Sequence, residues 1–193
     1  MNVYLWPNQS VMKNAYIGEV REYDFTSSDW GWILPSGVTR DSNGLYISSS
    51  SKWVDTYTQA PSDMYWGIPK KITITYYKTQ ASSWIWLRDW SNNNSLIYLP
   101  RNQNNLNSLL VYNWVSDTYL SLWANPIGTV VWEIDIDNST TNWTVTHKIT
   151  WCTTVTDTTW ALKNMFNSNN ISLRIVNWNA TTSVRVKTIV IEY

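Results

Sequence analysis

The sequence predicts an all-β protein, a two-sheet antiparallel β-sandwich of the jelly-roll type with at most one short helix. Apolar and polar residues alternate with a period of two over long stretches, clusters rich in Asn, Ser and Thr separate these stretches, and only one short segment has a helical pattern. No internal repeat or Pro/Gly-rich linker divides the chain, so we expect one domain over 1–193. A barrel is the alternative that periodicity leaves open.

The strands are predicted from the alternation, in which every second residue shares a face. The clearest alternation covers 71–78, 130–137, 143–151 and 184–191. Within 143–151, one face collects Trp143, Val145, His147, Ile149 and Trp151. Further strands are predicted near 16–25, 45–58, 84–90, 109–115, 119–124 and 171–178.

The segments between strands have turn composition, as in 39–44, 101–107 and 138–142. The chain has 21 Asn and only 6 Gly, which indicates that Asn supplies the left-handed turn positions. The single predicted helix begins after Asp157 as a capping residue. Its apolar side would consist of Trp160, Ala161, Leu162, Met165 and Phe166.

Three segments carry a resemblance to a known fold family. They are Glu22-Tyr23-Asp24-Phe25, the strand Gly44-Leu45-Tyr46-Ile47-Ser48, and the closing strand Arg185–Glu192. Together they resemble the concanavalin A-like or laminin G-like jelly roll, found in bacteriophage virion proteins and carbohydrate-binding domains. The resemblance lies in the succession of strands and turns over most of the chain, and it implies a sandwich fold.

A run of alternating carboxylates, Glu133-Ile134-Asp135-Ile136-Asp137, places three acidic side chains on one face of a strand. The run resembles the catalytic strand of jelly-roll beta-glucanases. That resemblance implies Glu133 as nucleophile, Asp135 as helper and Asp137 as acid/base, although Asp137 is one methylene shorter than the Glu that the pattern has. Two alternatives stay open: a solvated strand face, and a calcium site formed by Asp135, Asp137 and Asn138, whose oxygens suit calcium.

The aromatic run 84–90 is the second candidate site. Trp84, Trp86, Arg88 and Trp90 share one face, and Ile85 and Leu87 share the other. If the aliphatic face is the core, the indoles form a glycan-binding platform or a subunit interface. If the indoles form the core, no site exists there. The same alternatives apply to Trp30, Trp32, Trp66, Trp114 and Trp123.

Charge and composition argue against several classes. Lys and Arg (14) balance Asp and Glu (14) without a basic stripe, so no nucleic-acid partner is expected. No apolar run suits membrane insertion, and the first residues lack the pattern of a signal peptide. The single cysteine excludes an intrachain disulfide. With one histidine, His147, an ordinary zinc site is not expected; apart from the calcium option, we expect no cofactor.

A low content of charged residues (15%) with many Trp, Tyr and Asn is typical of proteins that face the exterior, yet no export signal is seen. The leading interpretation is a non-enzymatic structural component of a bacteriophage particle, on the capsid surface, a fibre or the tail. It would be made in the host cytoplasm, reside in the virion, and assemble with other virion proteins and copies of itself. The alternatives are a carbohydrate-binding module or adhesin that binds a cell-surface glycan, and a beta-glucanase-like hydrolase.

Overall fold

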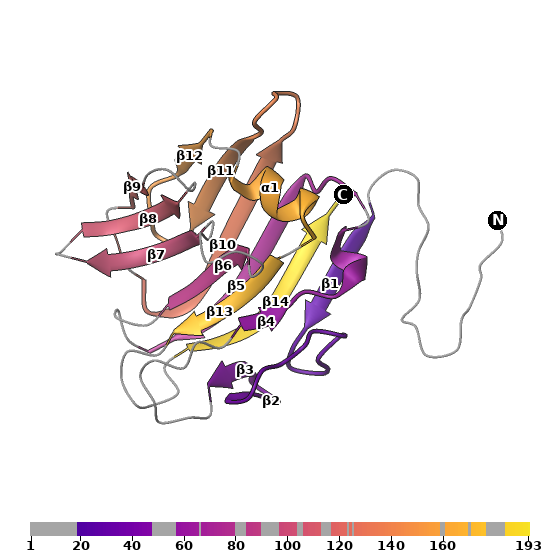
Figure 1. Cartoon of the computed structure of the whole chain (residues 1–193). Coiled ribbons are helices and arrows are strands. Elements are labelled where there is room, and N and C mark those ends of the chain that lie inside the picture. Colours follow the sequence, from indigo (N-terminus) through magenta and orange to yellow (C-terminus); the bar gives the residue numbers. More distant parts are fainter. Residues whose placement is uncertain are drawn as a thin grey trace.

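The structure, a computed structural model, describes residues 19–47, 57–65, 67–79, 84–89, 97–103, 106–112, 117–122, 124, 126–158, 161–169, 171–176 and 184–193. Its regular elements in this part of the chain are two antiparallel sheets, one short α-helix and one 3-10 helix (Figure 1). The predicted all-β sandwich with one short α-helix is confirmed. No helix of the described residues has the length and apolar content needed to cross a membrane.

The larger sheet has eight strands in the order β12-β11-β10-β5-β14-β3-β2, with β1 also paired to β14. Its strands are β1 (Val20–Asp24), β2 (Val38–Asp41), β3 (Gly44–Ile47), β5 (Lys71–Lys78), β10 (Gly128–Asp137), β11 (Thr144–Ile149), β12 (Val155–Asp157) and β14 (Val184–Glu192).

The smaller sheet has six strands in the order β4-β13-β6-β7-β8-β9. Its strands are β4 (Tyr57–Gln59), β6 (Trp84–Asp89), β7 (Ile97–Gln103), β8 (Leu106–Tyr112), β9 (Asp117–Ser121) and β13 (Ile171–Val176). The 3-10 helix η1 (Ser62–Tyr65) precedes β5, and α1 (Ala161–Asn167) joins β12 to β13.

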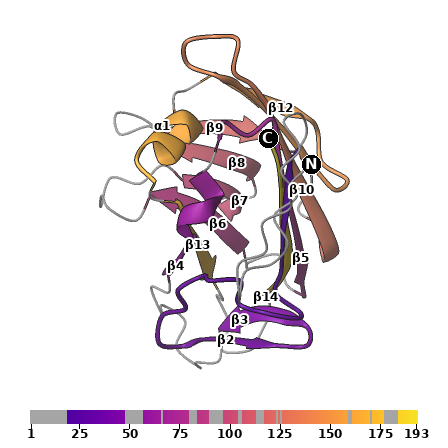
Figure 2. The same cartoon turned by 90° about the vertical axis from the view of Figure 1, so that its right-hand side faces the viewer.

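The two sheets form separate layers (Figure 2) with one hydrophobic core drawn from both. On β5, Ile72, Ile74 and Tyr76 are at most 1% exposed, and the residues between them are half-buried or exposed. The residues between Ile72, Ile74 and Tyr76 lie on the side of the larger sheet that faces away from the core. This side is called the outer face below. Burial on one side only is the physical origin of the period of two.

The predicted helix exists and buries Leu162, Met165 and Phe166, as expected. Asp157, however, is not its cap: it ends β12, where it pairs with Val145 of β11 and is 3% exposed. The backbone pairing with β11 holds Asp157 extended, so the helix begins only at Ala161. Trp160 lies outside the described residues, as does the side chain of Ala161.

Several strand boundaries differ from the expectation. The predicted strand at 45–58 is two elements in different sheets, β3 and β4, and residues 48–56 lie outside the described residues. The short strands β2 and β12 and the Pro-containing β7 were not predicted, and part of 39–44 and 101–107 is strand. Their neighbours in the sheets, rather than their own sequence pattern, hold these segments extended.

Left-handed backbone is used differently from the prediction. In the described part of the chain, the non-glycine residues with positive φ are Trp30, Trp143, Trp151 and Asn169. Among the described residues, tryptophan therefore occupies more of these positions than asparagine does, and the Asn-containing turns predicted at 91–95 and 179–183 lie outside the described residues. A bulky residue at positive φ is costly, so each such position needs a local reason.

Candidate functional site

The three carboxylates of β10 lie on the outer face, since Ile134 and Trp132 between and beside them are fully buried. Glu133 is opposite Lys148 of β11 and Thr73 of β5. Asp135 is opposite Lys71 of β5. Both acidic side chains are about one-third exposed, so they are open to solvent and to ligands.

Two lysines neutralise two of these carboxylates. Lys71 Nζ donates to Glu133 Oε1 at 2.7 Å and lies 4.0 Å from Asp135 Oδ1. Lys148 Nζ donates to Asp135 Oδ2 at 2.6 Å. The hydrogen bond to Glu133 is the main cause that raises the pKa of Lys71. We call these four residues the outer-face ion cluster.

Asp137 is outside this cluster. Its Oδ1 accepts a hydrogen bond from the backbone N–H of Ser139 at 2.9 Å. Hydrogen bonds from the side chain and the backbone of Ser139 lower the pKa of Asp137. A general acid in glycoside hydrolysis needs a raised pKa, so this environment is the opposite of what an acid/base role requires.

A metal site at this strand also lacks a ligand cluster. In the part of the chain that the structure describes, no three His, Cys, Asp or Glu side chains are placed to hold a metal ion. Lys148 occupies an oxygen of Asp135, and Ser139 occupies an oxygen of Asp137. Calcium binding by these residues with Asn138 therefore stays a prediction.

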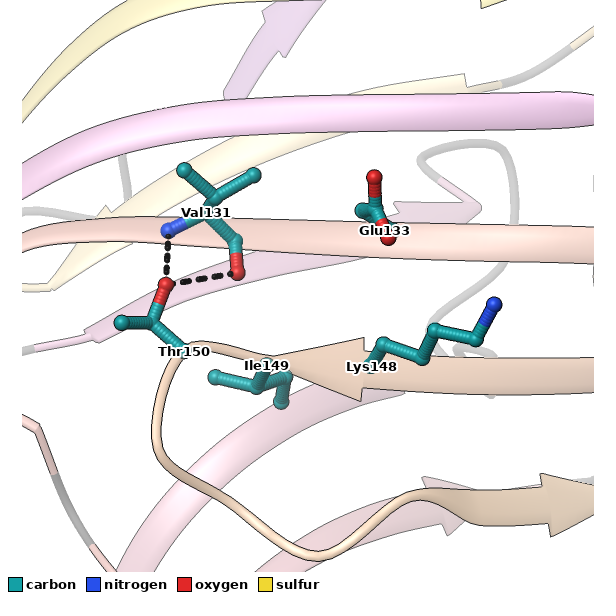
Figure 3. Close-up of a pocket in the computed structure, with 5 residues that line it drawn as sticks. All are labelled: Val131, Glu133, Lys148, Ile149 and Thr150. Carbon is teal, nitrogen blue, oxygen red and sulfur yellow. Dashed lines mark hydrogen bonds between the residues drawn. The ribbon is translucent and has the colours of Figure 1, made fainter.

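An open hollow of about 210 Å³ lies beside Glu133 at the end of β11 (Figure 3). It is lined by Val131, Glu133, Lys148, Ile149 and Thr150. The hydroxyl of Thr150 accepts from the backbone N–H of Val131 at 2.8 Å and donates to its carbonyl at 3.2 Å. This double contact closes the strand pair, and the hollow then has both charged and hydroxyl groups in its wall.

Trp151 follows Thr150 directly and is 80% exposed. Its φ is 60°, and the backbone turns there, because the N–H of Cys152 bonds to the carbonyl of Ile149. The alternation predicted Trp151 on the same face as His147. The strand ends at Ile149 instead, and a period of two carries no signal for such a reversal.

A second exposed ring lies on the outer face near the same end of β10. Tyr77 is 40% exposed and is opposite Thr129, two residues before Val131. β10 lies between β5, which carries Tyr77, and β11, whose end Trp151 follows by two residues. The sequence pattern predicts neither Tyr77 nor Trp151 as part of a site.

On β6, which contains the tryptophan run, the aliphatic face and not the indole face points toward the core. Ile85 and Leu87 are at most 2% exposed, so Trp86 and Arg88 are on the side of the smaller sheet that points away from the core. Trp90 and the side chain of Trp84 lie outside the described residues.

Trp86 is half-buried and already has a stacking partner within the chain. The guanidinium carbon of Arg174 lies 4.5 Å from the centre of its ring, and burial lowers the pKa of Arg174. The Nε1 atom of Trp86 is buried and has no hydrogen-bond partner among the described residues. The ring face that Arg174 occupies is therefore not free for a sugar, whereas Trp151 is open.

Of the other tryptophans that were candidates for a core, an interface or a glycan platform, two are described by the structure. Trp32 is 4% exposed and belongs to the core, and Trp30 is half-buried, with Nε1 donating to the carbonyl of Asp24 at 2.7 Å. Trp66, Trp114 and Trp123 lie outside the described residues.

Comparison with known proteins gives a likeness to solved structures. No family model matches the chain, and no curated protein matches it. Among solved structures, it is similar to an endo-1,3-beta-glucanase from Streptomyces sioyaensis, with 13% identity and a TM-score of 0.44 over 90% of this chain and 87% of the other.

This finding corrects the functional expectation. The expectation of a non-enzymatic protein is withdrawn: the solved structure to which the chain is similar is that of an enzyme, and a likeness of this size assigns no activity to the chain itself. The role in a virus particle gains no support from any of these comparisons.

Proposed function

We propose that the protein binds carbohydrate on the outer face of the larger sheet, with Trp151 as the stacking platform. The polar contacts would come from the adjoining hollow, whose wall contains Glu133, Lys148 and Thr150. A sugar ring has an apolar C–H face and a rim of hydroxyls. A flat indole beside charged and hydroxyl groups matches both features.

The observation that carries this proposal is the combination of exposure and backbone strain at Trp151. An indole that is 80% exposed contributes little to the core, and a left-handed backbone costs about 1–2 kcal/mol for a residue with a Cβ. Folding therefore gains little from tryptophan at this position. Strained residues of this kind cluster at ligand sites, where the strain positions a side chain.

The surroundings of Trp151 favour a sugar over a protein partner. Cores of protein interfaces are depleted of Lys, Glu and Asp. Here Glu133 and Lys148 line the hollow, and each is paired with another residue of the outer-face ion cluster. Threonines at 73, 75 and 150 add hydroxyl groups to the strands around it.

Binding is tested by affinity electrophoresis of the full chain in gels containing soluble polysaccharides, followed by titration of tryptophan fluorescence. Trp151→Ala should weaken binding by roughly tenfold or more, as expected for the loss of one aromatic contact in a desolvated site. Trp151→Phe should retain part of it. Ile68→Ala, which removes another exposed apolar side chain (54%), should change nothing. Equal binding by the wild type and Trp151→Ala would refute the proposal.

Glycoside hydrolysis is the second candidate, because Glu133 lines the hollow and Asp135 follows on the same face. Alternate strand positions place two carboxylates roughly 6.6–7 Å apart, which falls within the range of inverting hydrolases. Release of reducing sugar from a bound polysaccharide, abolished by Glu133→Gln, would establish it. Binding without release by the wild type would exclude it for that polysaccharide.

A further inference from the structure

Planar side chains form a row across the strands of the outer face. Tyr77 of β5 is opposite Thr129 of β10 on one side and Arg185 of β14 on the other. Arg185 in turn lies over the ring of Tyr46 of β3, with its guanidinium carbon 4.3 Å from the ring centre. The row therefore crosses β3, β14, β5 and β10, and the next strand is β11, whose end is followed by the turn that contains Trp151.

Arg185 is held rigidly in this row. Its Nη1 donates to both carboxylate oxygens of Asp41, at 2.7 and 2.8 Å. These hydrogen bonds are the main cause of the lowered pKa of Asp41. With Tyr46 beneath it and Asp41 beside it, the guanidinium plane is fixed before any ligand arrives, which reduces the entropy cost of binding.

The charge of the row itself is balanced, because Arg185 is paired with Asp41. Four to six residues farther along the strands of the same face, the charges of the outer-face ion cluster are also paired, Lys71 with Glu133 and Lys148 with Asp135. An acidic ligand would have to compete with these carboxylates, and a basic ligand would have to compete with the cations. A neutral ligand can accept and donate hydrogen bonds to the pairs without separating them.

From these observations, and resting on the proposed function, we infer that the row from Tyr46 to Trp151 is a track for a neutral, linear polysaccharide that lies across the strands. With strands about 4.8 Å apart, four steps from β3 to β11 give the track a length of roughly 19 Å. This is longer than a single sugar ring. The track recognises several successive units of the polymer.

The first experiment compares ligand charge. Affinity electrophoresis of the full chain uses neutral linear polymers (a glucan, a mannan, a xylan and a galactan) and acidic ones (polygalacturonate and a sulfated galactan). We expect retardation by at least one neutral polymer and weaker retardation by the acidic ones. Preference for an acidic polymer would overturn the inference and leave carbohydrate binding in place. Retardation by none of the polymers would overturn the proposed function itself.

The second experiment measures length. Isothermal titration uses purified oligosaccharides of the best neutral polymer, from the disaccharide upward. The Kd should fall with length until the track is spanned and then level off. Tyr46→Ala should raise the Kd of the longest oligosaccharide roughly tenfold and leave that of the disaccharide unchanged. Tyr46→Phe, which keeps the ring under Arg185, should retain wild-type affinity.

The outcomes separate the track from the platform. If Trp151→Ala weakens binding but affinity is independent of length and Tyr46→Ala has no effect, the track is refuted and the proposed function stands. Thermal unfolding confirms that each variant is folded. Should Tyr46→Ala unfold, Tyr77→Ala carries the same test from the middle of the row, where the ring is exposed.

Discussion

The indole Nε1 of Trp132 donates a hydrogen bond to Nδ1 of His147 at 3.2 Å, inside the core. The two rings are 5.9 Å apart, and neither residue is exposed. A nitrogen that accepts a hydrogen bond carries no proton, so this contact assigns the proton of the neutral imidazole to Nε2. Burial lowers the pKa of His147 to about 3, because the charged form would lose its hydration.

The free energy of unfolding should therefore decrease as the pH is lowered, before the carboxylates become protonated. Between the unfolded pKa of 6.5 and the folded value of about 3, the unfolded chain binds one more proton at His147 than the folded chain does. The free energy of unfolding thus increases with pH in this window, and the stability that His147 contributes is lost as the pH falls through it. Urea unfolding between about pH 7 and 4.5 should show this loss, on the order of 1–3 kcal/mol.

His147→Gln is the matched variant, because the amide oxygen can still accept the indole hydrogen bond but does not titrate. Its stability should change little over the same window. A loss equal to that of the wild type would show that other groups cause the acid sensitivity.

The sequence predicts a strand well when one face of that strand is buried and the other is exposed, because only then does the alternation of residues show it. β5 matches its predicted bounds because its residues alternate between buried and more exposed positions. Ile72, Ile74 and Tyr76 face the core, and Lys78 is a charged residue at the last buried position. β12 has three residues, too few for a period to be recognised, and its pairing with β11 decides its structure. Pairing partners far apart in the chain are invisible to a local pattern.

The candidate site was predicted only in part. Placing Glu133 and Asp135 on one face needs only the alternation, and placing them beside Lys71 needs the register of β10 against β5. The exposure of Trp151 could not be predicted in this way, because it depends on where β11 ends and not on the alternation of apolar and polar residues along the strand. Arg174 on Trp86 is likewise a contact between β13 and β6, more than eighty residues apart.

Gly44 should be among the least replaceable residues. Its φ is 111°, and a Cβ there would lie 2.2 Å from the carbonyl oxygen of Val186, where β3 approaches β14. Gly44→Ala should lower the free energy of unfolding by about 2–4 kcal/mol, since it combines a steric clash with backbone strain. Gly128→Ala is the control: its φ is 96°, but a Cβ would contact nothing within 4 Å, and about 1 kcal/mol is expected. Equal losses in urea unfolding would contradict the close approach of β3 to β14.

The two lysines of the outer-face ion cluster should differ in their effect on stability. The side chain of Lys71 is 27% exposed and faces both carboxylates, whereas that of Lys148 is 51% exposed. Lys71→Met should cost about 1 kcal/mol, and Lys148→Met should have little effect, because solvent screens the more exposed pair. The cost at Lys71 should shrink in about 1 M salt. A larger loss at Lys148 than at Lys71 would contradict the arrangement.

The backbone of Trp151 offers a test that separates stability from binding. Glycine adopts φ near 60° without steric cost, whereas alanine retains the Cβ that makes this conformation unfavourable. Trp151→Gly should therefore be more stable than Trp151→Ala by about 1 kcal/mol, the reverse of the usual order of these residues in regular structure. Both variants lack the indole, so both should lose carbohydrate binding to the same extent. If Trp151→Ala is the more stable in urea unfolding, the backbone there is unstrained, and exposure alone would have to support the assignment of Trp151 as the platform.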